Sequence, residues 1–111
     1  MNLEQNARAY FSVFQDKDLD ALSEMFDDDV SLKDWNISAQ GKQPVLEANR
    51  NIFDSLNKIG VEVQNLYESD NTVVAEILIS TDADEDILPV VDIITFGPDK
   101  KIQSIVAYRG N

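Results

Sequence analysis

The chain has 111 residues, of which 43% are hydrophobic, a proportion typical of a globular domain with one core. Its 9 basic and 21 acidic residues give a formal net charge of -12, and so negative a surface repels nucleic acid phosphates and anionic lipids. The sequence has no cysteine and no histidine, which excludes disulfides, thiolate nucleophiles, Ser-His-Asp triads and metal sites built on Cys or His. Any acid–base chemistry must therefore use Asp, Glu, Tyr, Lys or Arg, and we expect no metal or other cofactor.

The chain as a whole, residues 1–111, is expected to form a single domain. No apolar run is long enough to span a membrane, and the first residues are polar rather than a basic and apolar leader. We therefore expect a cytoplasmic protein that binds neither nucleic acid nor membrane.

The first half of the chain carries the periodicity of helices. Apolar residues recur at helical spacing over residues 3–15, which predicts an amphipathic first helix. Asp18 is a good N-cap for a second, short helix over residues 19–26. A third helix is predicted from Pro44, a residue favoured in a first turn, to about residue 56.

Strands are predicted between the second and third helices and in the second half of the chain. A short strand is predicted over residues 30–35, followed by a loop to residue 42. After Gly60 the apolar period changes to two, and short turns separate the segments, so neighbouring strands should be antiparallel. These strands are expected at residues 61–68, 72–81, 87–96 and 101–109. Helices followed by a run of strands predict an α+β fold, with three N-terminal helices packed on one face of a curved antiparallel sheet.

The outer face of this sheet is also apolar. Ile87, Val91 and Ile93 share one side of their strand, and one side of residues 72–81 is apolar too. A large exposed apolar surface usually marks a contact with a partner. We therefore expect a homodimer formed through the outer sheet face.

The opposite face of residues 87–96 carries a carboxyl group among apolar side chains. Leu88, Val90, Asp92, Ile94 and Phe96 alternate onto this face, so a carboxyl group lies among apolar side chains. Burial of an unpaired ionised carboxylate is very unfavourable, so Asp92 must either hold its proton or find a partner.

Two further polar groups are predicted to face the same way. Tyr10 lies on the apolar stripe of the first helix, and Asp34 shares a strand face with Val30 and Leu32. Each has an ordinary alternative, because a core tyrosine can bond its hydroxyl locally and an inward aspartate can cap a loop. Together with Asp92, they predict a phenol and two carboxyl groups around one cavity between helices and sheet.

The acidic segment 82–86 places carboxylates at the first, third and fifth positions of a calcium loop. Such a loop needs glycine at the sixth position and glutamate at the twelfth, and this chain has Ile87 and Ile93 there. We interpret the segment as a solvated hairpin turn and expect no metal site.

The layout of the chain is similar to that of a known group of proteins. Segments that carry the similarity are Tyr10-Phe11 and residues 17–22, 25–30 and 102–108. With them the chain resembles the SnoaL-like and ketosteroid isomerase-like branch of the nuclear transport factor 2-like superfamily. The resemblance covers essentially the whole chain and implies a cone-shaped, cystatin-like α+β fold that encloses a deep apolar pocket, commonly in a dimer.

The resemblance also implies roles for three residues. Tyr10 falls at the oxyanion tyrosine of the isomerases, Asp34 at the catalytic base and Asp92 at the protonated aspartic acid. In that chemistry the base moves a proton between carbons while the other two groups donate hydrogen bonds to a dienolate.

The chain departs from the isomerase pattern at several pocket positions. Phe26 and Asn49 stand where some isomerases have supporting tyrosines, and Arg109 stands where some relatives have an aromatic residue. Trp35 could lie at the pocket mouth, although its strand parity favours packing. The residues expected to line the pocket are Phe14, Phe26, Trp35, Asn49, Phe53, Val90, Ile94, Ile105, Ala107 and Arg109.

These features predict a pocket for a small, largely apolar molecule, in a protein that isomerises a ketone in the manner of a steroid delta-isomerase. One alternative is a non-catalytic domain of the same fold that binds a small molecule or only dimerises, and another is a SnoaL-like cyclase, dehydratase or hydrolase. An ion pair between Arg109 and Asp92 would favour the non-catalytic alternative, because it would keep the carboxylate ionised.

Overall fold

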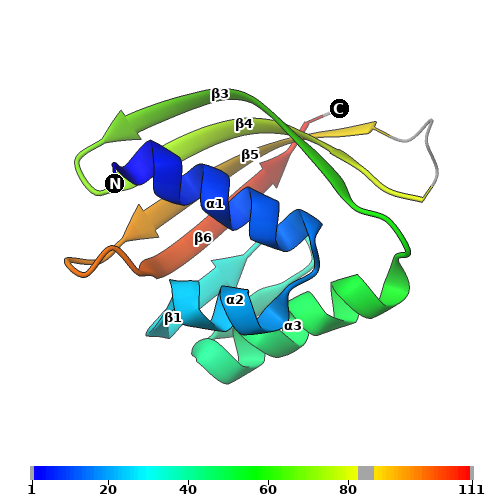
Figure 1. Ribbon diagram of the computed structural model, residues 1–111, viewed down its shortest axis with the longest axis horizontal. Helices are drawn as coiled ribbons and strands as arrows, with labels where there is room; N and C mark the ends of the chain where they lie inside the picture. The colour runs from blue at the N-terminus through cyan, green and yellow to red at the C-terminus, as the bar shows by residue number, and fades with distance from the viewer. Residues whose placement is uncertain (1, 83–86, 111) are drawn as a thin grey trace.

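In the computed structural model, residues 2–82 and 87–110 are described, and these fold as three helices and a curved six-stranded sheet (Figure 1). The helices are α1 (Leu3–Gln15), α2 (Leu19–Met25) and α3 (Lys42–Ser55). The strands are β1 (Phe26–Lys33), β2 (Ser38–Gln40), β3 (Gly60–Ser69), β4 (Thr72–Ser80), β5 (Ile87–Phe96) and β6 (Ile102–Arg109). The α+β architecture predicted from the sequence is confirmed.

Each helix begins at a residue suited to its first turn. Asn2 and Gln5 form a capping box at α1, in which each side-chain oxygen accepts from the other residue's backbone N–H. Asp18 accepts from the backbone N–H of Ala21, which confirms the predicted N-cap of α2. Gly41 precedes α3 with φ of +94°, a conformation that favours glycine.

The sheet has the strand order β2-β1-β6-β5-β4-β3. Strands β3 to β6 pair antiparallel with their neighbours in the chain, as the short turns predicted. The fully antiparallel sheet expected from the sequence is corrected at one pair, because β1 runs parallel to β6. The rule that short links join antiparallel strands does not apply there, since α3 and four strands separate β1 from β6 along the chain.

The N-terminal part of the sheet differs in two other ways from the prediction. Strand β1 begins at Phe26 rather than at residue 30, so the acidic run 27–29 belongs to the strand and not to a turn. Strand β2 forms within the segment expected to be a loop. It is three residues long with exposed polar ends, so it carries no period-two pattern that could predict it.

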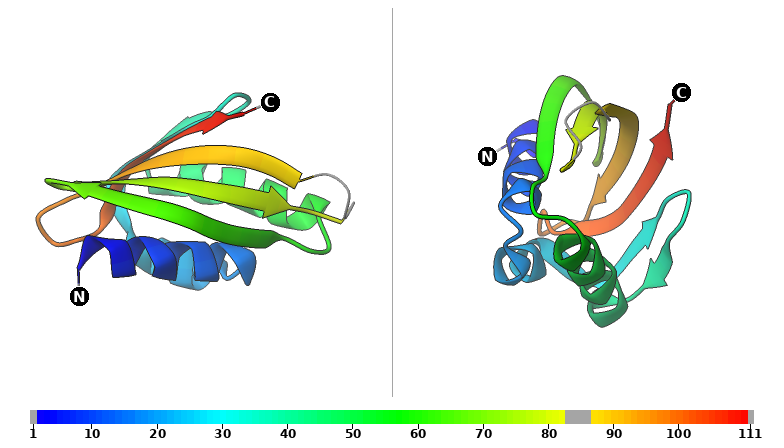
Figure 2. Two further views of the ribbon diagram at one scale, coloured as in Figure 1. Left: turned by 90° about the horizontal axis from the view of Figure 1, so that it is seen from above. Right: turned by 90° about the vertical axis from the view of Figure 1, so that its right-hand side faces the viewer.

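The sheet curls around the helices, as the end-on view in Figure 2 shows. Helix α1 packs on β3 and β4, and α3 packs on β1 and β2, so the helices cover the concave face. Strands β2 and β3 are the two edges of the sheet, which therefore stays open. No described helix has the length and apolar character needed to cross a membrane.

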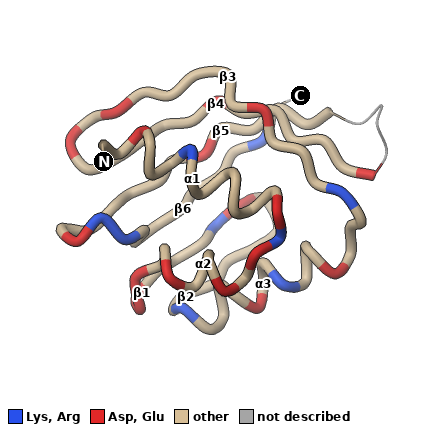
Figure 3. Tube along the Cα trace, viewed as in Figure 1, with Lys and Arg blue, Asp and Glu red and all other residues tan. Residues whose placement is uncertain are grey.

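Acidic side chains are distributed along the whole described chain rather than gathered on one element (Figure 3). Two surface ion pairs offset part of this charge, Lys42–Asp28 at 3.5 Å and Arg50–Glu47 at 3.9 Å. Exposed pairs of this kind contribute little to stability, which leaves burial of the apolar inner face as the main source of stability.

The core lies between the concave face and the helices. Ile94 of β5 is fully buried there, and its register neighbours are Val73 of β4 and Ile105 of β6. Leu22 of α2 and Phe26 at the start of β1 are also fully buried. These residues belong to the core that supports the site.

We expect Ile94→Ala to lower the free energy of unfolding by about 2–5 kcal/mol, because it removes buried methyl groups and leaves a cavity. Urea denaturation of both proteins measures the difference. The matched control is Ile87→Ala in the same strand, where the side chain is 56% exposed and the loss should stay below about 1 kcal/mol. Equal losses in the two variants would contradict this description of the core.

Candidate functional site

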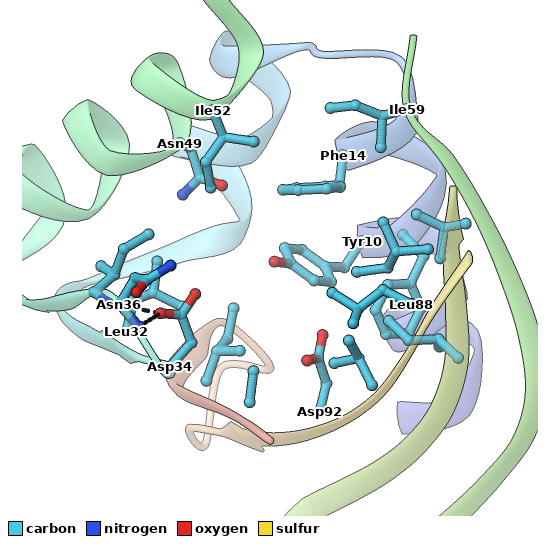
Figure 4. A pocket seen from close by; sticks show the side chains of 18 of the residues that line it. Tyr10, Phe14, Leu32, Asp34, Asn36, Asn49, Ile52, Ile59, Leu88 and Asp92 are labelled. Atoms are coloured by element: carbon cyan, nitrogen blue, oxygen red, sulfur yellow. Dashed lines mark hydrogen bonds between the residues drawn. The ribbon is translucent and has the colours of Figure 1, made fainter. Parts of the chain in front are cut away.

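A cavity of about 260 Å³ lies between α1, α3 and the concave face of the sheet (Figure 4). Its wall is largely apolar, and the polar side chains that line it include Tyr10, Asp34, Asn49 and Asp92, which come from different elements. A cavity of this kind, apolar with a few convergent polar groups, is the usual form of a small-molecule site.

Asp92 enters the cavity from the middle of β5. Its neighbours across the sheet are Ala75 of β4 and Ala107 of β6, whose small side chains leave room around the carboxyl group. Asp92 is only 8% exposed, and within the part of the chain described its carboxyl group makes no hydrogen bond. Burial raises the pKa of the Asp92 carboxyl to about 7, with a further contribution from the negative charge of Asp34.

Asp34 faces Asp92 from the turn that follows β1. Its Oδ1 accepts hydrogen bonds from the backbone N–H groups of Asn36 at 2.7 Å and Ile37 at 2.6 Å, while its own N–H donates to the carbonyl oxygen of Ile37 at 2.9 Å. These bonds fix the carboxylate and compensate its negative charge. Its second oxygen is directed into the cavity (Figure 4).

Tyr10 enters from the buried stripe of α1. Its ring packs against Phe11 and Phe26, at centroid distances of 5.3 Å and 6.4 Å, and the side chain is 5% exposed. The hydroxyl points into the cavity (Figure 4) and has no hydrogen-bond partner among the described residues. Burial, with a contribution from Asp92, raises the Tyr10 pKa well above its usual range, so the phenol stays neutral and able to donate.

Arg109 does not pair with Asp92. In the register of β5 and β6, Arg109 lies opposite Val90, whereas Asp92 lies opposite Ala107. The guanidinium carbon lies 5.8 Å from the centroid of the Trp35 ring, a cation–π arrangement, and no ion pair joins it to Asp92 in the described structure. The expectation that Arg109 lines the pocket is corrected, because its side chain is exposed outside the wall.

The other predicted pocket residues divide into two groups. Phe14, Trp35, Asn49, Val90, Ile105 and Ala107 line the cavity. Three expectations are corrected, since Phe26 and Ile94 are fully buried in the core behind the wall and Phe53 packs edge-on against Phe14 with 5.3 Å between ring centroids.

Several lining residues were not anticipated. Strand alternation could have assigned Ile77, Ile79 and Leu88 to the inner face, because they face the same way as Val90. The remaining residues lie on helix stripes, in turns or on β1 and β3, where periodicity does not distinguish pocket from core. They are Phe11, Leu32, Asn36, Ile37, Ile52, Leu56, Ile59 and Val61.

The acidic segment 82–86 has a structural role at its first residue. The Asp82 carboxylate accepts from the backbone N–H groups of Asn57 and Lys58, which ties the end of β4 to the connection between α3 and β3. The hairpin-turn interpretation of the rest concerns residues 83–86, which lie outside the described ones. Among residues 2–82 and 87–110, no cluster of three potential ligands is arranged for a metal ion.

The curved sheet and the helices around an apolar pocket have the fold of solved nuclear transport factor 2-like proteins. A family model described as the SnoaL-like domain matches residues 7–105, nearly the whole chain. The chain therefore belongs to the SnoaL-like domain family. No curated protein matches it.

Solved structures of similar fold have low sequence identity to this chain. A provisionally assigned SnoaL-like polyketide cyclase from Shewanella denitrificans OS-217 has a TM-score of 0.83 and 13% identity, with 97% of this chain and 90% of that chain covered. A provisionally assigned isomerase of the SnoaL-like family from Agrobacterium tumefaciens has a TM-score of 0.82 and 10% identity, with 95% and 94% covered. SalBIII, an epoxide hydrolase/cyclase-like enzyme in pyran ring formation in polyether salinomycin, has a TM-score of 0.83 and 19% identity, with 97% and 90% covered. These similarities establish the fold.

The raised pKa of Asp92 gives a testable dependence of stability on pH. The folded protein holds this proton up to about pH 7, whereas the unfolded chain releases it near the ordinary value of 3.8. The free energy of unfolding should therefore fall as pH rises between these values, by on the order of 4 kcal/mol at about 1.4 kcal/mol per unit. Asp92→Asn should remove most of this decrease, as measured by urea denaturation across this pH range.

An exposed aspartate on α3 provides the control. Asp54→Asn should keep the pH dependence of the wild-type protein, because Asp54 lies in solvent. If Asp92→Asn showed the same pH dependence as wild type, Asp92 would not be the buried, proton-holding carboxyl described here.

Proposed function

We propose that this protein catalyses cofactor-free proton transfer on a small, largely apolar carbonyl compound, as in the isomerisation of a ketone. One observation carries the proposal, namely that two carboxyl groups face one apolar cavity in opposite environments. Asp34 has two backbone donors, whereas Asp92 has no donor among the described residues and a pKa raised to about 7. A carboxylate held by backbone donors and a buried carboxyl group that holds its proton let one site supply both a base and an acid.

The roles follow from these environments. The Asp34 carboxylate removes a proton from the carbon next to the carbonyl group, and the electron pair of the C–H bond moves to the carbonyl oxygen. The Tyr10 hydroxyl and the protonated Asp92 donate hydrogen bonds to the enolate oxygen that forms. Asp34 then returns the proton to a different carbon, so the double bond moves and no oxidant or cofactor is consumed.

A second candidate uses the same acid and base. Opening of an epoxide also needs a proton donor at the leaving oxygen and a base that activates the attacking hydroxyl or water. The similarity in fold to SalBIII, described as epoxide hydrolase/cyclase-like, and the presence of a protonatable Asp92 opposite Asp34 favour this alternative over others in the family.

We expect Asp34→Asn to lower kcat for isomerisation of small cyclic β,γ-unsaturated ketones by about 10²–10⁴-fold, because it removes the base. Tyr10→Phe should lower kcat by about 10²–10³-fold, because it removes one donor to the enolate. The increase in ultraviolet absorbance of the conjugated product measures the rate. Tyr108→Phe, at a tyrosine that is 60% exposed, is the matched control and should leave kcat unchanged. An Asp34→Asn protein with the wild-type rate would refute the assignment of Asp34 as the base.

We also propose that the outer sheet face forms a homodimer. Val74, Ile93 and Val106 lie in register across β4, β5 and β6 on the side away from the helices. The exposed rings of Tyr67 and Tyr108 extend this apolar surface at its borders. An apolar patch of this kind suits a two-fold symmetric contact between two copies.

Ile93→Glu places a charge at the centre of the patch and should convert the dimer into a monomer, because an unpaired carboxylate cannot be buried there. Sedimentation velocity measures the change. Asn51→Glu adds the same charge on an exposed position of α3 and should leave the dimer intact. A monomeric wild-type protein would contradict the proposal.

A further inference from the structure

Asn49 is a buried polar side chain of the cavity that takes no part in the proposed proton transfer. Asn49 lies on α3, lines the cavity and is only 2% exposed. Its Nδ2 donates to the carbonyl oxygen of Val45, one turn earlier in the helix, at 2.9 Å. An amide that back-bonds to its own helix in this way has a fixed position.

This bond also fixes which end of the amide faces the cavity. If the amide were turned over, Oδ1 would lie against the Val45 carbonyl oxygen, and two acceptors would repel each other. Only the orientation with Nδ2 towards Val45 gives an attractive contact. Oδ1 is therefore the end that is free to meet a bound molecule (Figure 4).

The Oδ1 atom is an acceptor without a donor. Across residues 2–82 and 87–110, no side chain or backbone group donates a hydrogen bond to it. Its surroundings are apolar, with Ile52 and Phe14 among the lining residues nearby in Figure 4. Among the described residues no fully buried side-chain oxygen lacks a partner, so Oδ1 is accessible from the cavity and can accept a hydrogen bond from a molecule bound there.

We infer that Asn49 is a specificity-determining residue that accepts a hydrogen bond from a hydroxyl or N–H group of the bound molecule. In Figure 4, Asn49 lies across the cavity from Asp92, with the Tyr10 hydroxyl between them. The inference rests on the proposed function, in which the carbonyl end of the ligand meets Tyr10 and Asp92. A second, donating group of the ligand then meets Asn49, and an apolar ring or chain joins the two ends.

Matched ketones test the inference. The probes are 1-tetralone and its 5-, 6- and 7-hydroxy and methoxy derivatives. These are bicyclic molecules whose size suits the cavity. Isothermal titration calorimetry gives the Kd of each for the wild-type protein, Asn49→Leu and Asn51→Leu. Asn51 is exposed on the same helix, so its variant controls for a leucine on α3.

We expect at least one hydroxytetralone to bind the wild-type protein about tenfold or more tightly than both its methoxy counterpart and 1-tetralone. The hydroxyl preference should fall below about twofold in Asn49→Leu and persist in Asn51→Leu. Asn49→Ala serves as a second variant if the leucine variant does not fold.

Two results would overturn the inference: no hydroxytetralone gains affinity over its counterparts, or the gain survives removal of the Asn49 amide. The outcome is separable from that of the proposed reaction. A hydroxyl preference that depends on Asn49, in a protein that isomerises no ketone, would support the inference and refute proton transfer. A protein that isomerises a ketone but shows no such preference would support proton transfer and refute the inference.

Discussion

Burial of the Asp92 carboxyl group in an apolar wall is the constraint on which the account of this site depends. The group has no cation and no hydrogen-bond donor within the described chain, and its pKa is raised to about 7. Two features of the sheet maintain this state. Alanines on both flanking strands leave space beside the carboxyl rather than a partner, and strand register places Arg109 opposite Val90, with its guanidinium over Trp35. A cation at Asp92 would remove the group's capacity to donate a hydrogen bond.

The fold then sets this carboxyl against groups from other parts of the chain. Asp34 comes from the turn after β1 and is fixed by two backbone donors, whereas Tyr10 comes from the buried stripe of α1 and stays a neutral phenol. The parallel pairing of β1 with β6 brings the Asp34 turn beside the strand that flanks Asp92. A base and two donors therefore face one apolar space, which is an arrangement suited to charge that develops on a carbonyl oxygen.

Much of this could be predicted from the sequence, for reasons that differ between elements. Helical spacing and period-two alternation are local, so the helices, the antiparallel strands and the inward side of β5 with Asp92 follow from the residues alone. The pairing of β1 with β6 depends on contacts distant in sequence, and β2 is too short and polar to carry a pattern. Pocket and core residues share the same stripes, which is why Phe26, Phe53 and Ile94 were expected in the wall but lie behind it. Asn36 and Ile37, which hold Asp34, lie in a turn without any signal.

The most direct test of the account is the titration of the Asp92 side-chain carboxyl carbon by NMR, with the signal assigned from its loss in Asp92→Asn. The account predicts that Asp92 stays protonated well above the ordinary aspartate value and titrates near pH 7. Titration of Asp92 near its ordinary value of 3.8 would contradict the account, because an ionised carboxylate cannot donate a hydrogen bond to an enolate.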